Sequence, residues 1–154
     1  ACKPKLLIAD EPTTALDVTI QAQILELIKE LLTKYSSSLL MITHNLGIIA
    51  EICRNVAVMY AGRIIEYGSV EEVFGNPLNC YTVGLFGSIP KLDGPRERLV
   101  SIPGTVANPE HLPSGCPFHT RCAECKEICK TQMPPMVQVN EHHFVACHRV
   151  TGGK

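Results

Sequence analysis

The sequence predicts an α/β fold with a mostly parallel sheet and flanking helices. Short, mostly apolar runs at residues 5–9, 39–42 and 55–60 have the length of strands, and the first two suit buried strands of the kind that is covered on both faces. Between the first two runs, residues 18–35 carry apolar side chains three and four positions apart, which is the spacing of one helix face. Strand, helix and strand in this order form βαβ units, in which the strands are parallel.

Local signals mark the ends of these elements. Asp17 stands directly before the helical run, where aspartate is a good N-cap, and the three serines at 36–38 end that helix. Asn45 predicts the cap of a second, short helix. Ala61-Gly62 predicts a turn after the third strand, and residues 63–68 return as its hairpin partner.

The composition then changes. Seven prolines lie between residues 76 and 117, so long regular elements are not expected there: Pro77, Pro90, Pro95, Pro103, Pro109, Pro113 and Pro117. We place a domain boundary between Gly87 and Pro95, which gives domains 1–87 and 88–154. The second domain is too small to rely on an apolar core, so we expect a staple such as a metal centre.

Charge and hydropathy exclude some functions. The net charge of -1 gives no electrostatic reason to expect nucleic acid as a partner. The apolar stretches are too short and too interrupted to span a bilayer, and no charged-then-apolar signal segment opens the chain.

Polar residues follow two of the predicted strands. Asp10 and Glu11 come after the first strand, and His44 follows the second. Ligands of open α/β sheets bind at the carboxyl ends of the strands. One carboxylate there can hold Mg²⁺ through water, the second can orient a water for attack on a phosphoryl group, and the histidine can contact the terminal phosphate. Taken singly, the acidic pair also fits a turn, and His44-Asn45 also fits a helix cap.

Two stretches resemble the second half of an ABC transporter nucleotide-binding domain: LLIADEPTTALD at residues 6–17 and LLMITHNL at residues 39–46. Residues 6–11 resemble the Walker B strand and residues 14–17 the D-loop, while His44 matches the switch histidine. Further on, MYAGRIIEYGSVEEVFGNP is similar to the stretch that follows this histidine in importers.

The resemblance implies ATP and Mg²⁺ as cofactors. By this resemblance, Asp10 would help to hold Mg²⁺ through water and Glu11 would polarise the attacking water. His44 would be the second catalytic residue, in contact with the terminal phosphate. Asp17 would couple the two subunits of an ATPase dimer.

The motif that cradles phosphates, G-x-x-x-x-G-K-[ST], does not occur in the sequence. The Q-loop and the LSGGQ-type signature helix of the family are also missing. The chain therefore resembles the C-terminal half of a P-loop-type ABC ATPase domain plus an irregular, proline- and cysteine-rich extension. We expect this polypeptide alone to bind ATP weakly or not at all, because catalysis needs positioned phosphates as well as a base.

Residues 74–117 resemble the extension of ATPase subunits of oligopeptide, dipeptide and nickel importers. The matching positions are Asn76-Pro77, Tyr81-Thr82, Leu85, Ser88-Ile89-Pro90, Ile102-Pro103-Gly104 and Gly115-Cys116-Pro117-Phe118. The chain has Asn79-Cys80 where the family usually has His-Pro, so the role of that histidine does not carry over.

Five of the eight cysteines lie at or after residue 116, in the pattern C-x5-C-x2-C-x3-C-x17-C. Thiolates at this density suit Zn²⁺ or an iron–sulfur cluster, and a reducing cytosol disfavours the alternative of disulfides. The pattern is neither that of a zinc ribbon nor that of a ferredoxin. Cys2, Cys53 and Cys80 stand apart in the sequence, and we interpret them as isolated thiols.

The related extension is associated with a [4Fe–4S] cluster, and the resemblance implies Cys116, Cys122, Cys129 and Cys147 as its ligands. Cys125 would be spare. His119 and His148 are rival ligands, which leaves zinc as the alternative.

By resemblance, the chain belongs to an ATP-hydrolysing subunit that drives an ABC importer for peptides, located peripherally on the cytoplasmic face of the membrane. Its partners would be a second ABC ATPase subunit, identical or not, a pair of membrane permease subunits and, indirectly, a substrate-binding receptor.

The alternative function is that of a metal- or iron–sulfur-binding interaction module without ATPase activity. Soluble ABC ATPases of DNA repair or translation share the acidic pair but lack the extension. Dipeptides, oligopeptides, nickel, opines and glycosides all remain open as substrates.

Overall fold

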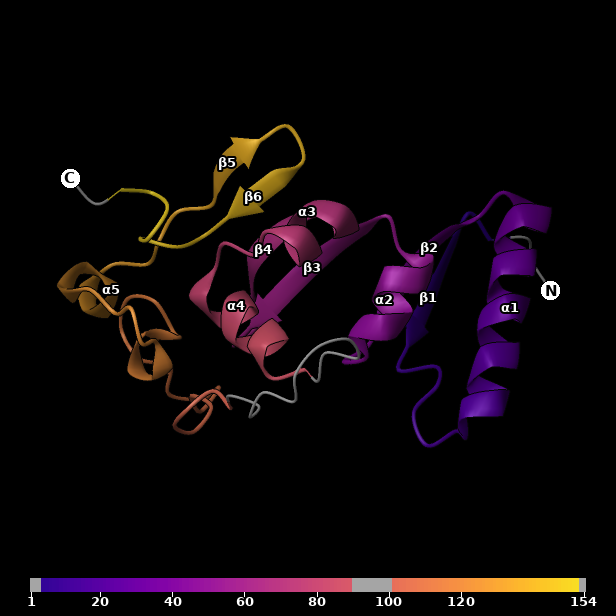
Figure 1. Ribbon diagram of the computed structural model, residues 1–154, viewed down its shortest axis with the longest axis horizontal. Helices are drawn as coiled ribbons and strands as arrows, with labels where there is room; N and C mark the ends of the chain where they lie inside the picture. The colour runs from indigo at the N-terminus through magenta and orange to yellow at the C-terminus, as the bar shows by residue number, and fades with distance from the viewer. Residues whose placement is uncertain (1–3, 90–100, 153–154) are drawn as a thin grey trace, which may run out of the picture. The chain divides into compact units, whose positions relative to one another are not determined.

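A computed structural model describes residues 4–89 and 101–152 (Figure 1). The chain divides into two compact units, Ala1–Arg54 and Asn55–Lys154, which we call the N-terminal unit and the C-terminal unit and describe separately. Most of the predicted boundary region, and Cys2 among the predicted isolated thiols, fall outside the described residues. The division into domains 1–87 and 88–154 stays a prediction.

The N-terminal unit is a βαβ unit followed by a short helix. Strands β1 (Leu6–Asp10) and β2 (Ser38–Ile42) pair in parallel, and helix α1 (Val18–Tyr35) connects them. Helix α2 (Leu46–Ile52) follows β2. Apolar side chains of the two helices form the core of this unit: Leu25, Ile28, Ile48 and Ile49.

The two strands are not covered on both faces, so that expectation is wrong. Leu6 and Ile8 of β1 remain 50% and 59% exposed, and Leu40 and Ile42 of β2 are exposed to a similar degree. Side chains alternate between the two faces of a strand, and only every second residue of β1 and β2 is less exposed. One face of the pair is therefore open in the described part of the chain.

The predicted caps of α1 and α2 are confirmed. The Asp17 carboxylate accepts hydrogen bonds from the backbone N–H groups of Thr19 and Ile20, both at 3.0 Å. Ser36 ends α1 in the left-handed conformation, with φ at 49°. The Asn45 side chain accepts a hydrogen bond from the N–H of Gly47 at 3.0 Å and so caps α2.

The C-terminal unit opens with the predicted hairpin. Strand β3 (Asn55–Tyr60) and strand β4 (Arg63–Ser69) pair antiparallel across Ala61-Gly62. Both turn residues have positive φ, 48° and 74°, as a two-residue turn that follows the twist of the strands requires. Helix α3 (Val70–Gly75) and helix α4 (Cys80–Gly87) come next.

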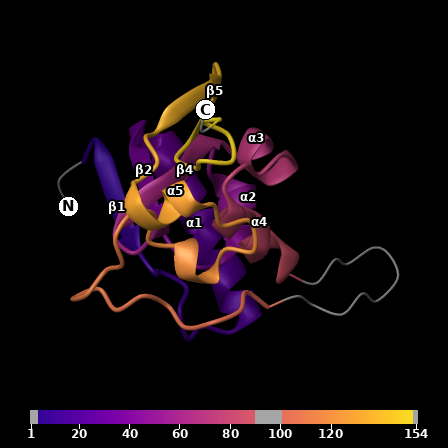
Figure 2. The ribbon, with the colours of Figure 1, turned by 90° about the vertical axis from the view of Figure 1, so that its left-hand side faces the viewer.

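Residues of the extension also form short regular elements, where the sequence predicts irregular structure. These are the 3-10 helix η1 (His119–Arg121), helix α5 (Glu127–Thr131), strand β5 (Val137–Asn140) and strand β6 (His143–Val145). Figure 2 views this unit from the side on which α5 lies. Both strands come after the last proline, Pro135, so the proline-rich composition does not restrict them.

The described sheets are mostly antiparallel, which corrects the prediction of a mostly parallel sheet. The order in the C-terminal unit is β3-β4-β6-β5, and every pair in it is antiparallel. Only β1 and β2 are parallel among the described strands. The reason is that the extension adds β6 and β5 to the open edge of the predicted hairpin.

None of the described helices is long and apolar enough to cross a membrane.

A buried carboxyl group joins the hairpin to the extension. Glu66 of β4 has no exposed surface, and it accepts hydrogen bonds from the N–H groups of Leu78 at 2.7 Å and Asn79 at 3.0 Å. Its Oε1 also lies 2.8 Å from Nε2 of His143, which is equally buried in β6. Beside this pair, Gly68 permits close approach, because a Cβ there would lie 2.5 Å from the carbonyl oxygen of His142.

We expect Glu66→Ala to lower the free energy of unfolding by about 3–5 kcal/mol, because it leaves three donors, two of them fully buried, without their acceptor. Urea unfolding followed by circular dichroism measures this change. Glu141→Ala is the matched control: the Glu141 side chain is 87% exposed, and its loss should change stability by no more than about 0.5 kcal/mol. Equal effects of the two substitutions would contradict this account of the Glu66 site.

Candidate functional sites

The first site lies where β1 and β2 end. Because the strands are parallel, with Asp10 opposite Ile42, the residues that follow them meet at the same edge. The N–H of Glu11 donates to the carbonyl of Ile42 at 2.8 Å. Nδ1 of His44 lies 2.8 Å from Oε1 of Glu11. The structure thus brings together the predicted base and the predicted switch histidine.

A tight turn orients the Glu11 carboxylate. Glu11 has a φ of 46°, which is rare for a residue with a side chain and occurs mainly at turns and functional sites. The Thr14 hydroxyl donates to Oε2 of Glu11 at 2.6 Å, and the Thr14 N–H donates to the Glu11 carbonyl at 3.1 Å. Sequence reasoning did not assign this orienting role to Thr14. The three-residue spacing from Glu11 is the signal that could have shown it.

The surroundings of Glu11 favour its ionised form. The hydrogen bond from Thr14, followed by that from His44, lowers the pKa of the Glu11 carboxyl. An ionised carboxylate only accepts hydrogen bonds, so Nδ1 of His44 carries the proton in this pair. The His44 side chain is 81% exposed, which leaves its other ring nitrogen available to a ligand.

The other two predicted residues of this site lie outside the hydrogen-bonded group. Asp10 is exposed at the end of β1, one residue before Glu11. The Asp17 carboxylate is engaged in capping α1. Among the contacts of the described residues, none links either side chain to the Glu11–His44 pair.

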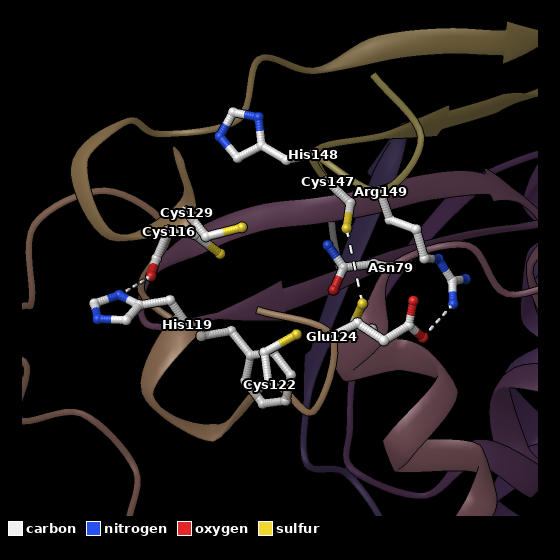
Figure 3. Close-up of a pocket in the computed structure, with 11 residues that line it drawn as sticks. Asn79, Cys116, His119, Cys122, Glu124, Cys129, Cys147, His148 and Arg149 are labelled. Atoms are coloured by element: carbon white, nitrogen blue, oxygen red, sulfur yellow. Dashed lines mark hydrogen bonds and ion pairs between the residues drawn. The ribbon is translucent and has the colours of Figure 1, made fainter. Parts of the chain in front are cut away.

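The second site is a small cavity of the C-terminal unit, which we call the thiol cavity (Figure 3). It has a volume of about 20 Å³. Five of its lining residues are cysteines: Cys80, Cys116, Cys122, Cys129 and Cys147. The structure therefore brings all four predicted cluster ligands to one place, whereas Cys125, the predicted spare, does not line the cavity.

Local backbone contacts position two of these thiols. The N–H of Cys116 donates to the carbonyl of Cys129 at 2.8 Å. Gly115 makes this approach possible: its φ is 70°, and a Cβ there would lie 2.4 Å from the Cys129 carbonyl oxygen. The loop before η1 and helix α5 are thereby held side by side.

Cys80 is not an isolated thiol, so that interpretation was wrong. Its Sγ lies 3.9 Å from Sγ of Cys147, and the contact is drawn as a dashed line in Figure 3. Sequence spacing could not show this contact, because 67 residues separate the two cysteines. The available signal was the departure at position 80 itself, where cysteine replaces the proline of the resembled family's usual His-Pro pair.

The thiols differ in their protonation. Burial raises the pKa of Cys116 to about 11. The pKa of Cys147 is lowered to about 6, chiefly by the hydrogen bond with Cys80, and the same contact raises that of Cys80. Within this pair the proton therefore stays on Cys80.

The two predicted rival ligands also line the cavity, but each has one ring nitrogen engaged. Nδ1 of His119 donates to the carbonyl of Cys116 at 2.9 Å, and Nε2 of His148 donates to the carbonyl of Gln132 at 3.0 Å. Each imidazole is thus held in one orientation by a backbone carbonyl.

The spacing of the donors does not match a single metal ion. In the described part of the chain, no three His, Cys, Asp or Glu side chains are grouped closely enough to hold one. A tetrahedral Zn²⁺ site with Zn–S bonds of about 2.3 Å places its sulfurs about 3.8 Å apart. The Cys80–Cys147 pair has this spacing, at 3.9 Å, and the side chain of Cys122 also interacts with that of Cys80. Thiolates are ligands of both zinc and iron–sulfur clusters, so the chemistry of the cavity's cysteines fits either kind of centre.

Comparison with known proteins identifies similar chains. The family model for the C-terminal region of oligopeptide/dipeptide transporters matches residues 65–129, from β4 to α5. The oligopeptide transport ATP-binding protein OppD of Haemophilus influenzae is 53% identical over 141 residues, which cover 92% of this chain and 43% of that protein. The chain is similar to these ATP-binding proteins over nearly its whole length. It corresponds to their C-terminal part, as the resemblance in the sequence implied.

Other oligopeptide transport ATP-binding proteins are nearly as similar. OppD of Salmonella typhimurium is 48% identical over 148 residues, with 96% of this chain and 44% of that protein covered. The oligopeptide transport ATP-binding protein AppD of Bacillus subtilis is 48% identical over 147 residues, with 96% and 45% covered. The chain thus spans less than half the length of these relatives.

We expect Gly115→Ala to disturb the thiol cavity, because the new methyl group would collide with the Cys129 carbonyl in a backbone conformation that disfavours alanine. The free energy of unfolding should fall by about 1–3 kcal/mol. The half-buried thiols should also react faster with a thiol reagent, which absorbance measures directly.

Gly75→Ala is the control for this prediction, because a Cβ at Gly75 would meet nothing within 4 Å. It should leave thiol reactivity unchanged and stability within about 1 kcal/mol of the parent. Unchanged thiol reactivity in Gly115→Ala would show that the glycine does not position Cys116 and Cys129.

Proposed function

We propose that this chain is part of an ATP-hydrolysing subunit that drives a membrane importer for peptides. The observation that carries the proposal is the Glu11–His44 hydrogen bond of 2.8 Å at the carboxyl end of a parallel strand pair. The comparisons also support the proposal, because the relatives named above are oligopeptide transport ATP-binding proteins.

Glu11 is the proposed group that acts on water. Thr14 and His44 each bond one of its oxygens, and every carboxylate oxygen has a second lone pair with which it can accept a bond from water. The lowered pKa keeps Glu11 ionised near neutral pH, as is needed for a group that polarises a water molecule. The exposed side of His44 can then bond the terminal phosphate.

Asp10 and Asp17 have separate proposed roles. Asp10 would hold Mg²⁺ through water, and this ion would neutralise the charge that develops on the phosphates. Asp17 fixes the start of α1, and with it the loop of residues 14–17 that we propose to contact a second ATPase subunit. The phosphates themselves would be held by residues other than these, because the sequence contains no phosphate-cradling motif.

The proposed partners follow from this role. They are a second ABC ATPase subunit, a pair of membrane permease subunits and, indirectly, a substrate-binding receptor. The subunit would lie peripherally on the cytoplasmic face of the membrane. Closure of the ATPase dimer around ATP would move the permease, as in other ligand-driven domain closures.

A chimera tests the proposed catalytic role. In it, this chain replaces the matching part of the Haemophilus influenzae relative, and ATP hydrolysis is measured as phosphate release. We expect Glu11→Gln to lower the rate by about 10²–10⁴-fold, because glutamine cannot take up a proton from water. Glu30→Gln is the control, since Glu30 is exposed on α1 and its replacement should leave the rate unchanged. A chimera that hydrolyses ATP equally well with Glu11→Gln would refute the assignment.

We propose further that the thiol cavity holds a [4Fe–4S] cluster on Cys116, Cys122, Cys129 and Cys147. Convergence of these four thiols on one cavity supports the proposal. When bound, the cluster would fix α5, the loop before η1 and the residues after β6 to one another. A short extension with little apolar core gains its stability from such a centre.

Metal analysis separates this proposal from the zinc alternative. We expect about four irons and four sulfides per chain after anaerobic purification or reconstitution. Cys129→Ser should lose most of the iron, whereas Cys125→Ser should retain it, because Cys125 does not line the cavity. A colourless protein with stoichiometric zinc would overturn the cluster and leave the cavity as a zinc site.

A further inference from the structure

The thiol cavity contains one cysteine more than the proposed cluster requires. Cys80, at the start of α4, lies 3.9 Å from Cys147 through their sulfur atoms. Both thiols are half-buried and line the cavity, so they are protected from bulk solvent but remain next to open space.

Hydrogen bonds on both sides of the pair hold its two backbone segments together. Nδ2 of Asn79, the residue before Cys80, donates to the carbonyl of Ala146, the residue before Cys147, at 2.9 Å. Nη2 of Arg149 donates to the carbonyl of Leu78 at 2.9 Å. Glu66 fixes the same segment by accepting from two of its N–H groups.

We propose that Cys80 and Cys147 form a reversible disulfide when the cavity holds no metal. Bond formation brings the sulfurs from 3.9 Å to about 2.05 Å, a movement that side-chain rotation and small backbone shifts can supply. The two anchored segments keep the cysteines facing each other while this occurs. Cys80, which stands where the resembled family usually has proline, provides the second sulfur.

The oxidant in this reaction is a small-molecule disulfide. The thiolate of one cysteine attacks one sulfur of the small disulfide and releases a small thiolate, leaving a mixed disulfide on the protein. The second cysteine then attacks the protein sulfur of that mixed disulfide and releases the second small thiolate. The two protein thiols lose two protons and two electrons in total, and one small disulfide becomes two small thiols. The sulfur of Cys147, while so bonded, is not a thiolate and cannot serve as a ligand.

Tryptic peptides map this bond without ambiguity. Cleavage after Lys and Arg places Cys80 as the sole cysteine of peptide 64–91 and Cys147 as the sole cysteine of peptide 131–149. The chain is treated with a chelator, exposed to oxidised glutathione, alkylated, digested and analysed by mass spectrometry. We expect these two peptides to be joined in most molecules and to separate again after treatment with dithiothreitol.

Two variants complete the experiment. Cys80→Ser should abolish the linked peptide, whereas Cys53→Ser, which removes a thiol of the N-terminal unit, should leave its yield unchanged. A chelated wild-type chain that joins other cysteines, or none, while peptides 64–91 and 131–149 stay separate would overturn the proposal. Because the mapping needs no metal, failure of the iron–sulfur assignment would leave this test intact.

Discussion

The C-terminal unit depends on the buried contact of Glu66 with His143. A carboxyl group with no exposed surface is tolerated only when donors satisfy it, and Glu66 receives them from β6 and from the two residues that precede α4. This contact joins parts of the chain 77 residues apart. It fixes the start of α4 and the strand that leads to Cys147, so the position of two cavity thiols follows from one buried acid.

The two candidate sites are built in different ways. At the first site, the parallel register of β1 and β2 brings Glu11 and His44 to one edge, and a turn closed by Thr14 aims the carboxylate. Its geometry thus comes from one βαβ unit. At the thiol cavity, cysteines from α4, from both sides of η1, from α5 and from the residues after β6 converge. That geometry exists only once the extension has joined the sheet of the hairpin.

This difference explains how much could be predicted from the sequence. Helix α1 was predicted at its observed bounds, because its apolar periodicity, the Asp17 cap and the serines after it are all local signals. The hairpin turn at Ala61-Gly62 was equally local. Strand β6 was missed because so short a strand becomes stable only on pairing with a distant partner, here β4, and β5 pairs in turn with β6. Cys80 was misjudged for the same reason, since its neighbour Cys147 is recognisable only in the folded chain.

Asn79 uses both ends of its amide group. Its Oδ1 accepts from the N–H of Tyr81 and caps α4, while its Nδ2 donates to the carbonyl of Ala146. Aspartate and serine are as good as asparagine at a helix N-terminus, but aspartate has no donor when ionised, and serine is too short to span both partners. Aspartate or serine at position 79 would keep the cap of α4 but lose the bond to Ala146, a cost that helix preferences alone would not reveal.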